Sequence, residues 1–190
     1  MKELLYENHT FEDGDYHGQK IRDKEFDACT FIRCNFSDSD FFKTKFIDCK
    51  FIDCNLSNAV LAETGLQTVM FKNCKLIGLD FQYCSDFLLA LEFEDCQMDF
   101  SSFFQMKIPE TKFNRCKLEG ADFIETDLTK ASFEECNLLE VKFENTTLER
   151  VNFQTAYNFR VDPELNKIRK AKFSRTNLEG LLVKYQLDLS

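Results

Sequence analysis

The sequence predicts an all-β solenoid, a chain wound into four-sided coils and closed by a short helical cap at its C-terminal end. Two periods and one change of pattern predict this fold. Apolar residues recur every five positions, the same kinds of residue recur every twenty, and both periods end shortly before residue 162. The 190 residues, 44% of them hydrophobic and 30% charged, are enough for one such array with a buried core.

The period of five runs through most of the chain. Fifteen consecutive positions five residues apart, from Phe11 to Phe81, are all apolar. A second run extends from Phe93 to Phe153, so the phase has moved by two residues between the runs. A period of five fits neither the helical period of about 3.6 nor the strand period of about 2. Each unit of five is therefore expected to form one side of a coil that turns a corner before the next unit.

The period of twenty gives the number of sides. Steps of 20 residues, with one step of 22, connect a column made only of Phe: Phe11, Phe31, Phe51, Phe71, Phe93, Phe113, Phe133 and Phe153. A second column, two residues before a central residue, is made only of Cys: Cys34, Cys54, Cys74, Cys96, Cys116 and Cys136. Four sides per coil is the simplest closure. Coils stacked about 4.8 Å apart would then place identical side chains over one another.

The repeats divide the chain into three parts. In residues 1–25, the place two residues before a central residue holds His9, Gly14, Gln19 and Lys24, and not the Cys, Ser, Thr or Ala common in later units, which indicates an imperfect N-terminal capping coil. Residues 26–161 form the solenoid body. If Cys84 keeps an inward place, the two extra residues of the body form a bulge within 85–87. Residues 162–190 form the C-terminal cap.

Two short helices with a strand between them are expected in the C-terminal segment. Asp162, Pro163 and Glu164 have the order of an N-cap, a first helical residue and an acidic first turn. A last strand is expected at 171–173. Apolar residues then recur every three to four positions, as on an amphipathic helix: Leu178, Leu181, Leu182 and Tyr185. This helix covers the open end of the solenoid, either alone or by docking against its copy in a second chain.

Single units resemble the repeat of the pentapeptide-repeat proteins. Residues 121–125 and 136–140 have a small residue, Asp or Asn, a large apolar residue and two further positions that tend to be polar. The resemblance covers residues 9–157 and implies a right-handed quadrilateral β-helix. Residues 162–168 and 180–185 resemble the C-terminal segment of the Qnr quinolone-resistance and microcin-B immunity subfamilies. In the Qnr proteins this segment holds a dimer together, so the resemblance implies a homodimer.

Charge and hydropathy indicate which classes of partner the protein can bind. The net charge of −9 argues against direct binding of nucleic acid, and it favours a protein partner with a basic surface. No apolar run approaches the length of a membrane helix, so no membrane contact is expected. The first seven residues carry acid where a secretory signal needs a basic segment, which predicts a cytoplasmic protein.

The sequence does not predict an enzyme. His9 and His17 are the only histidines, both in the irregular first coil, and neither a glycine-rich phosphate loop nor a His-Glu-x-x-His motif occurs. The nine cysteines contain no Cys-x-x-Cys pair and fall at the small inward position, as buried structural thiols would. No catalytic residue, metal site or cofactor is therefore expected.

Three groups of residues are candidates for contact with a partner. Phe87 lies in the expected bulge, where it is either part of a tolerated surface insertion or a presented contact. Three apolar residues follow the central residues of one side and would form an exposed row there: Phe42, Phe104 and Ile124. Dispersed outward acids complete the set: Asp122, Glu125 and Glu144.

The resemblance also implies a function. It points to a non-enzymatic rod that is like DNA in shape and charge and binds the basic, DNA-holding surface of DNA gyrase, with quinolone resistance or toxin immunity as the result. The alternative is a scaffold that presents the apolar row to an unrelated protein. Charge mimicry is expected to weaken strongly as ionic strength rises, whereas an apolar contact is not.

Overall fold

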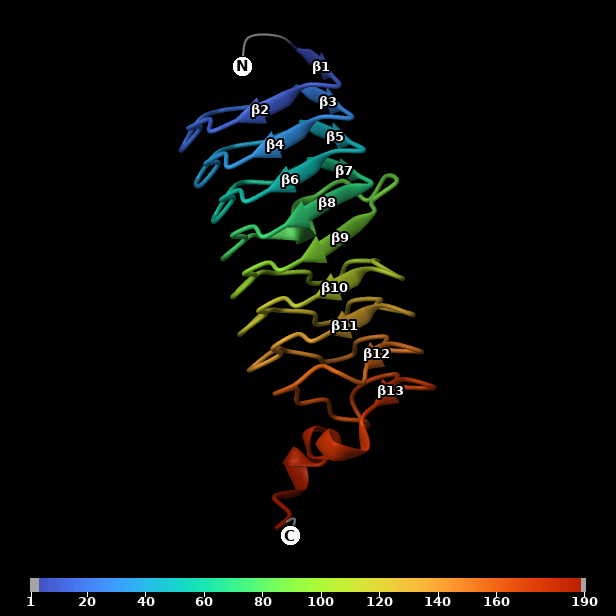
Figure 1. Cartoon of the computed structure of the whole chain (residues 1–190). Coiled ribbons are helices and arrows are strands. Elements are labelled where there is room, and N and C mark those ends of the chain that lie inside the picture. The colour runs from blue at the N-terminus through green and yellow to red at the C-terminus, as the bar shows by residue number, and fades with distance from the viewer. Residues whose placement is uncertain (1–3, 189–190) are drawn as a thin grey trace.

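The chain is a right-handed quadrilateral β-helix of about 8 coils, closed at its C-terminal end by short helical segments (Figure 1). This is a computed structural model, and it describes residues 4–188. We number the four sides of each coil in chain order, so that the first coil contributes Tyr6, Phe11, Tyr16 and Ile21 as the central residues of sides 1 to 4. The predicted fold class is confirmed.

Two parallel sheets run along adjacent sides of the rod (Figure 1). The sheet on side 1 has four strands: β1 (Leu5–Glu7), β3 (Glu25–Asp27), β5 (Lys45–Ile47) and β7 (Gly65–Gln67). The sheet on side 2 has nine: β2 (Thr10–Glu12), β4 (Thr30–Ile32), β6 (Lys50–Ile52), β8 (Val69–Lys72), β9 (Leu91–Glu94), β10 (Lys112–Asn114), β11 (Ser132–Glu134), β12 (Asn152–Phe153) and β13 (Lys172–Phe173). On sides 3 and 4, successive coils are joined by isolated β-bridges, such as that of Asn35 with Asn55 on side 3 and that of Ser102 with Asp122 on side 4.

The column of Phe residues lies in register along side 2. Phe31 pairs with both Phe11 and Phe51, and the stacked ring centroids along the column are 4.7 to 5.4 Å apart. The column gains a ninth member, because Phe173 of β13 stacks on Phe153 at 5.2 Å. Rings of opposite sides meet edge to face across the core, as Phe113 of side 2 and Phe123 of side 4 do at 5.8 Å. The core is therefore a continuous aromatic stack, as the period of twenty predicts.

The corners need a left-handed backbone, and the sequence supplies polar residues there. The residue two positions after a central residue has a positive φ in nearly every unit, for example 56° at Asp38 and 52° at Asn73. Asn and Asp tolerate this region better than most residues do. Leu88 and Phe100, with φ of 54° and 59°, are bulky exceptions.

The phase change is a loop between Ser85 and Leu91. Ser85 still bridges Gly65 with the regular step of 20, whereas Leu91 pairs with Val69 by a step of 22. The regular coil thus continues through Ser85, and the two extra residues lie between Ser85 and Leu91. They extend beyond the expected range of 85–87. Cys84 is half-buried and not fully inside the core. The side 1 sheet ends at this loop, since no strand follows β7 on that side among the described residues.

The C-terminal segment departs from the predicted helices. Residues 163–165 form a turn, in which the Asp162 carboxylate accepts a hydrogen bond from the Glu164 N–H (2.9 Å). Lys167 then forms a parallel β-bridge with Thr147. The segment therefore continues the solenoid by one further coil, and the helix expected from Asp162 onward does not form. The expected strand at 171–173 is present as β13.

The expected amphipathic helix is a pair of 3₁₀ helices. They are η2 (Arg175–Leu181), kinked at Asn177, and η3 (Val183–Tyr185), and a third such helix, η1 (Phe81–Tyr83), lies on side 4. Within residues 4–188, no helix has both the length and the apolar character needed to cross a bilayer.

Candidate partner-binding surfaces

Side 4 brings together six of the seven predicted contact residues. Its central residues are all buried: Phe41, Leu61, Phe81, Phe103, Phe123 and Phe143. The predicted residues flank these centres within three positions: Phe42, Phe104, Asp122, Ile124, Glu125 and Glu144. Because successive coils stack in register, these side chains line one long surface of the rod.

The apolar row on side 4 is less exposed than expected. Phe42, Phe104 and Ile124 are half-buried, because the neighbouring coils above and below cover part of each side chain. Cations also lie over the Phe42 ring, with the Arg22 guanidinium carbon 5.9 Å and the Lys43 Nζ 5.0 Å from its centroid. The expectation of an exposed apolar row is therefore corrected to a row of partly covered residues.

The three predicted acids of side 4 have no ion pair with any described cation, whereas Asp40 and Glu63 on the same side pair with Arg22 and Lys43. The Asp122 carboxylate accepts a hydrogen bond from the Ile124 N–H (2.8 Å), which fixes the turn. The Glu125 carboxylate accepts from the Gln105 amide (2.7 Å), and Glu144 is exposed. These three carboxylates therefore keep their charge available to a partner.

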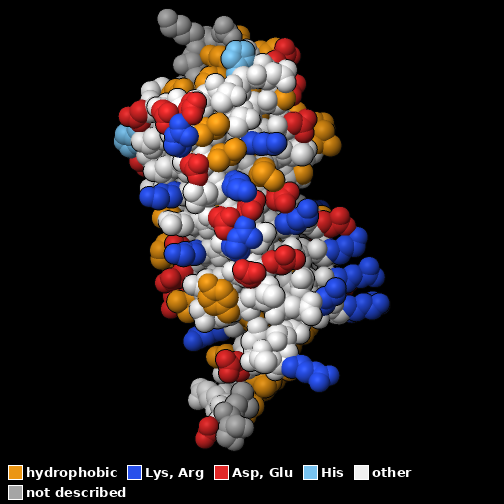
Figure 2. All heavy atoms as spheres, viewed as in Figure 1, with side chains coloured by type: hydrophobic (Ala, Val, Ile, Leu, Met, Phe, Trp, Pro, Cys, Tyr) orange, Lys and Arg blue, Asp and Glu red, His pale blue; other side chains and the backbone are white. Residues whose placement is uncertain are grey.

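On side 2, most charged side chains are paired within the chain. The Arg33 guanidinium pairs with Asp13 (2.7 Å), and Arg115 pairs with Asp95 (2.7 Å). Arg115 holds the pKa of the Asp95 carboxyl below its usual value by hydrogen bonding. Acidic and basic side chains are accordingly interleaved over the strands of side 2 (Figure 2). The charge of this side is largely neutralised within the chain.

The loop between β8 and β9 exposes large apolar side chains. Phe87 and Leu88 are each 66% exposed, and Tyr83, at the preceding corner, is 61% exposed. Phe87 lies on side 1 and not on side 4. On side 1 it borders a groove of about 440 Å³ together with Lys45 and Glu63. Leu88 and Tyr83 are exposed residues that the sequence pattern did not predict as contacts. The phase change in the sequence could have indicated that Leu88 is exposed. For Tyr83, only its place at an outward corner indicated exposure.

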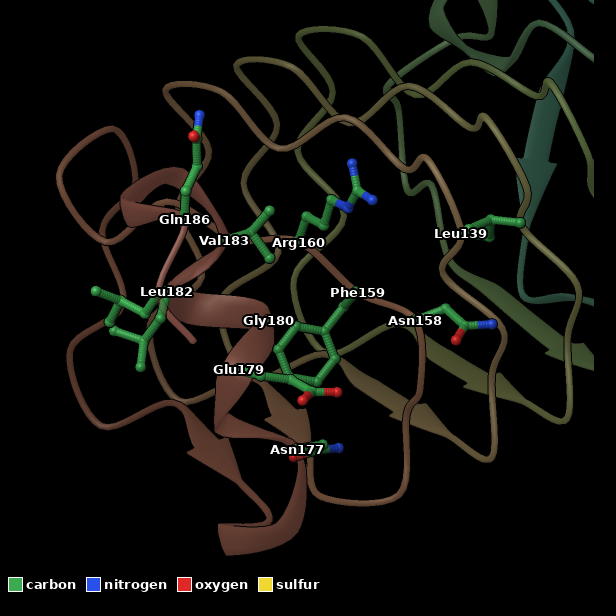
Figure 3. A pocket seen from close by; sticks show the side chains of 11 residues that line it. Leu139, Asn158, Phe159, Arg160, Asn177, Glu179, Gly180, Leu182, Val183 and Gln186 are labelled. Atoms are coloured by element: carbon green, nitrogen blue, oxygen red, sulfur yellow. The ribbon is translucent and has the colours of Figure 1, made fainter. Parts of the chain in front are cut away.

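The four predicted dimer residues of the C-terminal cap differ in exposure. Leu178 and Tyr185 are exposed, whereas Leu181 and Leu182 are half-buried, and Leu181 packs against the core. Gly180 is buried against the last coil, and Phe159 points from that coil towards it (Figure 3).

Polar contacts hold the end of the cap to the last coil. The Lys184 ammonium pairs with Asp162 (2.8 Å) and Glu164 (2.6 Å). The Tyr185 hydroxyl donates to Glu164 (2.9 Å). A groove of about 520 Å³ remains between the cap and the last coil, lined by residues such as Phe159, Leu182 and Val183.

The thiols line the inside of the solenoid. Eight of the nine free cysteines are buried, and Cys54 Sγ donates to the Phe31 carbonyl (3.4 Å) in the coil before it. Burial raises the pKa of Cys49 to about 12 and also raises the pKa of Cys74. Cys49 and Cys74 are therefore protonated near neutral pH. Across the described part of the chain, no three His, Cys, Asp or Glu side chains are grouped so as to hold a metal ion.

Comparison with known proteins agrees with this architecture. The chain can be superposed on trypsin-treated QnrB1, a plasmid-mediated fluoroquinolone resistance protein, with a TM-score of 0.73 and 14% sequence identity over 98% of this chain and 99% of that one. HetL, a pentapeptide repeat protein involved in heterocyst differentiation regulation in the cyanobacterium Nostoc, gives a TM-score of 0.41 and 14% identity over 90% and 86% of the two chains. No curated protein matches the sequence. The model of the pentapeptide repeat region matches residues 24–103 and 106–182. The chain therefore belongs to the pentapeptide repeat family.

Proposed function

We propose that this protein is a non-enzymatic rod whose side 4 binds a basic protein surface. The observation that carries the proposal is the set of carboxylates on side 4 that no described cation pairs with: Asp122, Glu125 and Glu144. The likeness of fold to QnrB1 makes the DNA-holding surface of DNA gyrase the first partner to test. We place the protein in the cytoplasm, where its nine free thiols remain reduced.

The distribution of charge supports such a partner. Residues 1–149 contain 16 Lys and Arg against 29 Asp and Glu, a net charge of −13. A long, strongly acidic body is attracted towards a basic surface before contact is made, which raises the association rate at low salt. Most charged side chains of side 2 are paired within the chain, whereas Asp122, Glu125 and Glu144 are not, so we propose that these three acids orient the rod towards its partner.

A gyrase supercoiling assay with and without a quinolone tests the proposal. The wild-type protein is expected to inhibit supercoiling or to protect against the drug at micromolar concentration. The triple variant Asp122→Asn, Glu125→Gln and Glu144→Gln is expected to be roughly tenfold weaker, since each exposed charge contact contributes about 0.5 kcal/mol. Asn at 122 retains an acceptor for the turn.

A matched control changes the net charge equally on other surfaces. Glu7→Gln, Glu134→Gln and Glu135→Gln replace exposed acids of sides 1 and 2 for which no ion pair exists in the described chain. This variant is expected to retain most of the wild-type effect. The absence of any effect of the wild-type protein on gyrase would exclude mimicry of its DNA.

A second candidate function is a scaffold that binds an unrelated protein through apolar contacts. The exposure of Tyr83, Phe87 and Leu88 favours it, because three large apolar side chains so close together on a surface are typical of a partner contact. Binding through this loop is expected to survive high salt, and a Phe87→Ser variant is expected to abolish it. Binding that disappears at high salt would favour the charged surface of side 4 instead.

We also propose that two chains associate through the C-terminal cap. Leu178, Val183 and Tyr185 are the exposed apolar residues of η2 and η3, and the groove beside Phe159 adds further apolar surface. Sedimentation of a Leu178→Asp variant tests this association, because Leu178 can be changed without disturbing the core, whereas Leu181 packs against it. If the dimer persisted in this variant, the cap would only close the end of the solenoid and would not hold two chains together.

A further inference from the structure

The last coil is basic, although the chain as a whole is acidic. Residues 150–175 carry seven Lys and Arg against two acids, a net charge of +5, whereas residues 1–149 carry −13. Both acids, Asp162 and Glu164, are paired with Lys184. The seven cations have no carboxylate partner within residues 4–188: Arg150, Arg160, Lys167, Arg169, Lys170, Lys172 and Arg175.

Arg150 and Lys170 of this group continue a straight column that begins at Lys130, at the corner between sides 1 and 2. Lys130, Arg150 and Lys170 occupy the same corner position in three consecutive coils, with φ of 61°, 60° and 59°. The backbone N–H of Lys130 donates to the Glu149 carbonyl (2.8 Å), and that of Arg150 to the Arg169 carbonyl (3.0 Å), so the coils are locked in register. A column of basic side chains is visible along the edge of the lower half of the rod (Figure 2).

The column becomes wider in the last coil. Lys167 and Lys172, on either side of this corner, are fixed by pairing with Thr147 and Asn152 of the coil before. Arg169 lies directly beside Lys170 in the sequence, and all of these basic side chains are exposed. Two carboxylates, those of Asp127 and Glu149, lie within the cluster and are half-buried, and Glu110 pairs with Lys130 (2.6 Å) at its upper end.

We propose that this basic corner binds the phosphate backbone of duplex nucleic acid. A line of cations at a regular spacing of about 4.8 Å fits a linear, regularly charged polymer. None of the described corner residues in 127–132, 147–152 and 167–172 is an exposed large apolar residue, so the surface has nothing to insert into a membrane or to stack on bases. Recognition is therefore of the backbone and independent of sequence.

The acidic body limits this contact to one end of the rod. Repulsion between the body and phosphates prevents the chain from lying along a duplex, so only the basic corner approaches it. The net charge of −9 led to the opposite expectation, because an average over the chain conceals a segregated end. The proposed site does not depend on gyrase or on side 4.

Fluorescence anisotropy with a labelled mixed-sequence duplex DNA tests the proposal on the full chain. The logarithm of the binding constant is expected to fall linearly with the logarithm of salt concentration, with a slope of about −4 to −5 for five unpaired cations. The variant Arg150→Gln, Lys170→Gln and Lys172→Gln is expected to reduce that slope by about 3 and to weaken binding at least tenfold at low salt.

A matched control removes three exposed lysines elsewhere: Lys50→Gln, Lys75→Gln and Lys117→Gln. This control should bind much as the wild type does, and circular dichroism should show that both variants are folded. Equal loss in the two variants would overturn the proposal, because it would show a dependence on net charge alone. It would also be overturned if the duplex did not bind, or if polyglutamate or vesicles of anionic lipid bound more tightly than the duplex.

Discussion

At the scale of the residue, the side chains of the Phe column are held on every face. Phe113 is fully buried between Phe93 and Phe133, at centroid distances of 5.1 and 4.8 Å, and meets Phe103 and Phe123 edge to face. A rigid stack of coils cannot collapse around a missing ring, so the cavity remains.

We therefore expect Phe113→Ala to lower the free energy of unfolding by about 3–5 kcal/mol. Phe11→Ala is the matched control, since Phe11 belongs to the same column but lies half-buried in the first coil, with a Phe of the column stacked on one face only. Its cost is expected to be clearly smaller. Denaturant titrations of both variants measure the difference, and equal losses would contradict the continuous stack.

The corner residue Leu88 is strained as well as exposed. Its φ of 54° is unfavourable for a branched side chain, and its side chain is 66% exposed. Leu88→Asn is expected to raise the free energy of unfolding by about 1 kcal/mol, because Asn tolerates the left-handed region. Thermal unfolding checks the gain, with Asn58→Leu at an equivalent corner as the reverse test, for which a loss is expected. A destabilised Leu88→Asn protein would show that Leu88 supports the loop through packing.

At the scale of the element, the cap depends on a close approach of backbone to ring. A methyl group added at Gly180 would lie 2.6 Å from the Phe159 ring, and the ring is itself buried. We expect Gly180→Ala to displace η2 and to cost about 1–3 kcal/mol. Hydrogen exchange of residues 175–185 measures the displacement, and exposed Glu179→Ala is the neighbouring control. Unchanged protection in Gly180→Ala would show that the last coil can move to admit the methyl group.

The elements also show how far the sequence could predict the fold. The strands and their register followed from the period of twenty, because stacking requires identical residues to recur at each coil. The helix expected at Asp162 did not form, since its local start signal competes with a ladder pairing of Lys167 that only the folded coils offer. The exposure of Phe42 and Phe104 was overestimated because neighbouring coils shield an outward side chain, which a one-dimensional pattern does not include.

At the scale of the whole molecule, the buried thiols make stability depend on alkaline pH. Burial raises the pKa of Cys49 to about 12, above the value of about 8.5 for a thiol in an unfolded chain. Between these values the unfolded chain has lost a proton that the native chain retains. Stability is therefore constant up to about pH 8.5 and falls as pH rises beyond it.

Melting temperatures measured from neutral pH to about pH 10.5 check this expectation. The variant Cys49→Ala and Cys74→Ala should show a shallower alkaline fall than the wild type, because two of the responsible thiols are absent. The native wild-type thiols should also react slowly with a thiol reagent and completely after denaturation. Equal alkaline slopes in the two proteins would assign the fall to other groups.

The step of twenty residues, interrupted once by the loop before β9, also constrains how such a chain can change length. Deleting or duplicating a whole coil would shorten or lengthen the rod and leave every later residue facing the same direction. Deleting a single unit of five would rotate all that follows by a quarter turn, so that Asp122 and Glu144 would no longer align with Phe42. Evolution or design can thus adjust the reach of this molecule in coarse increments while its partner-facing surface keeps its orientation.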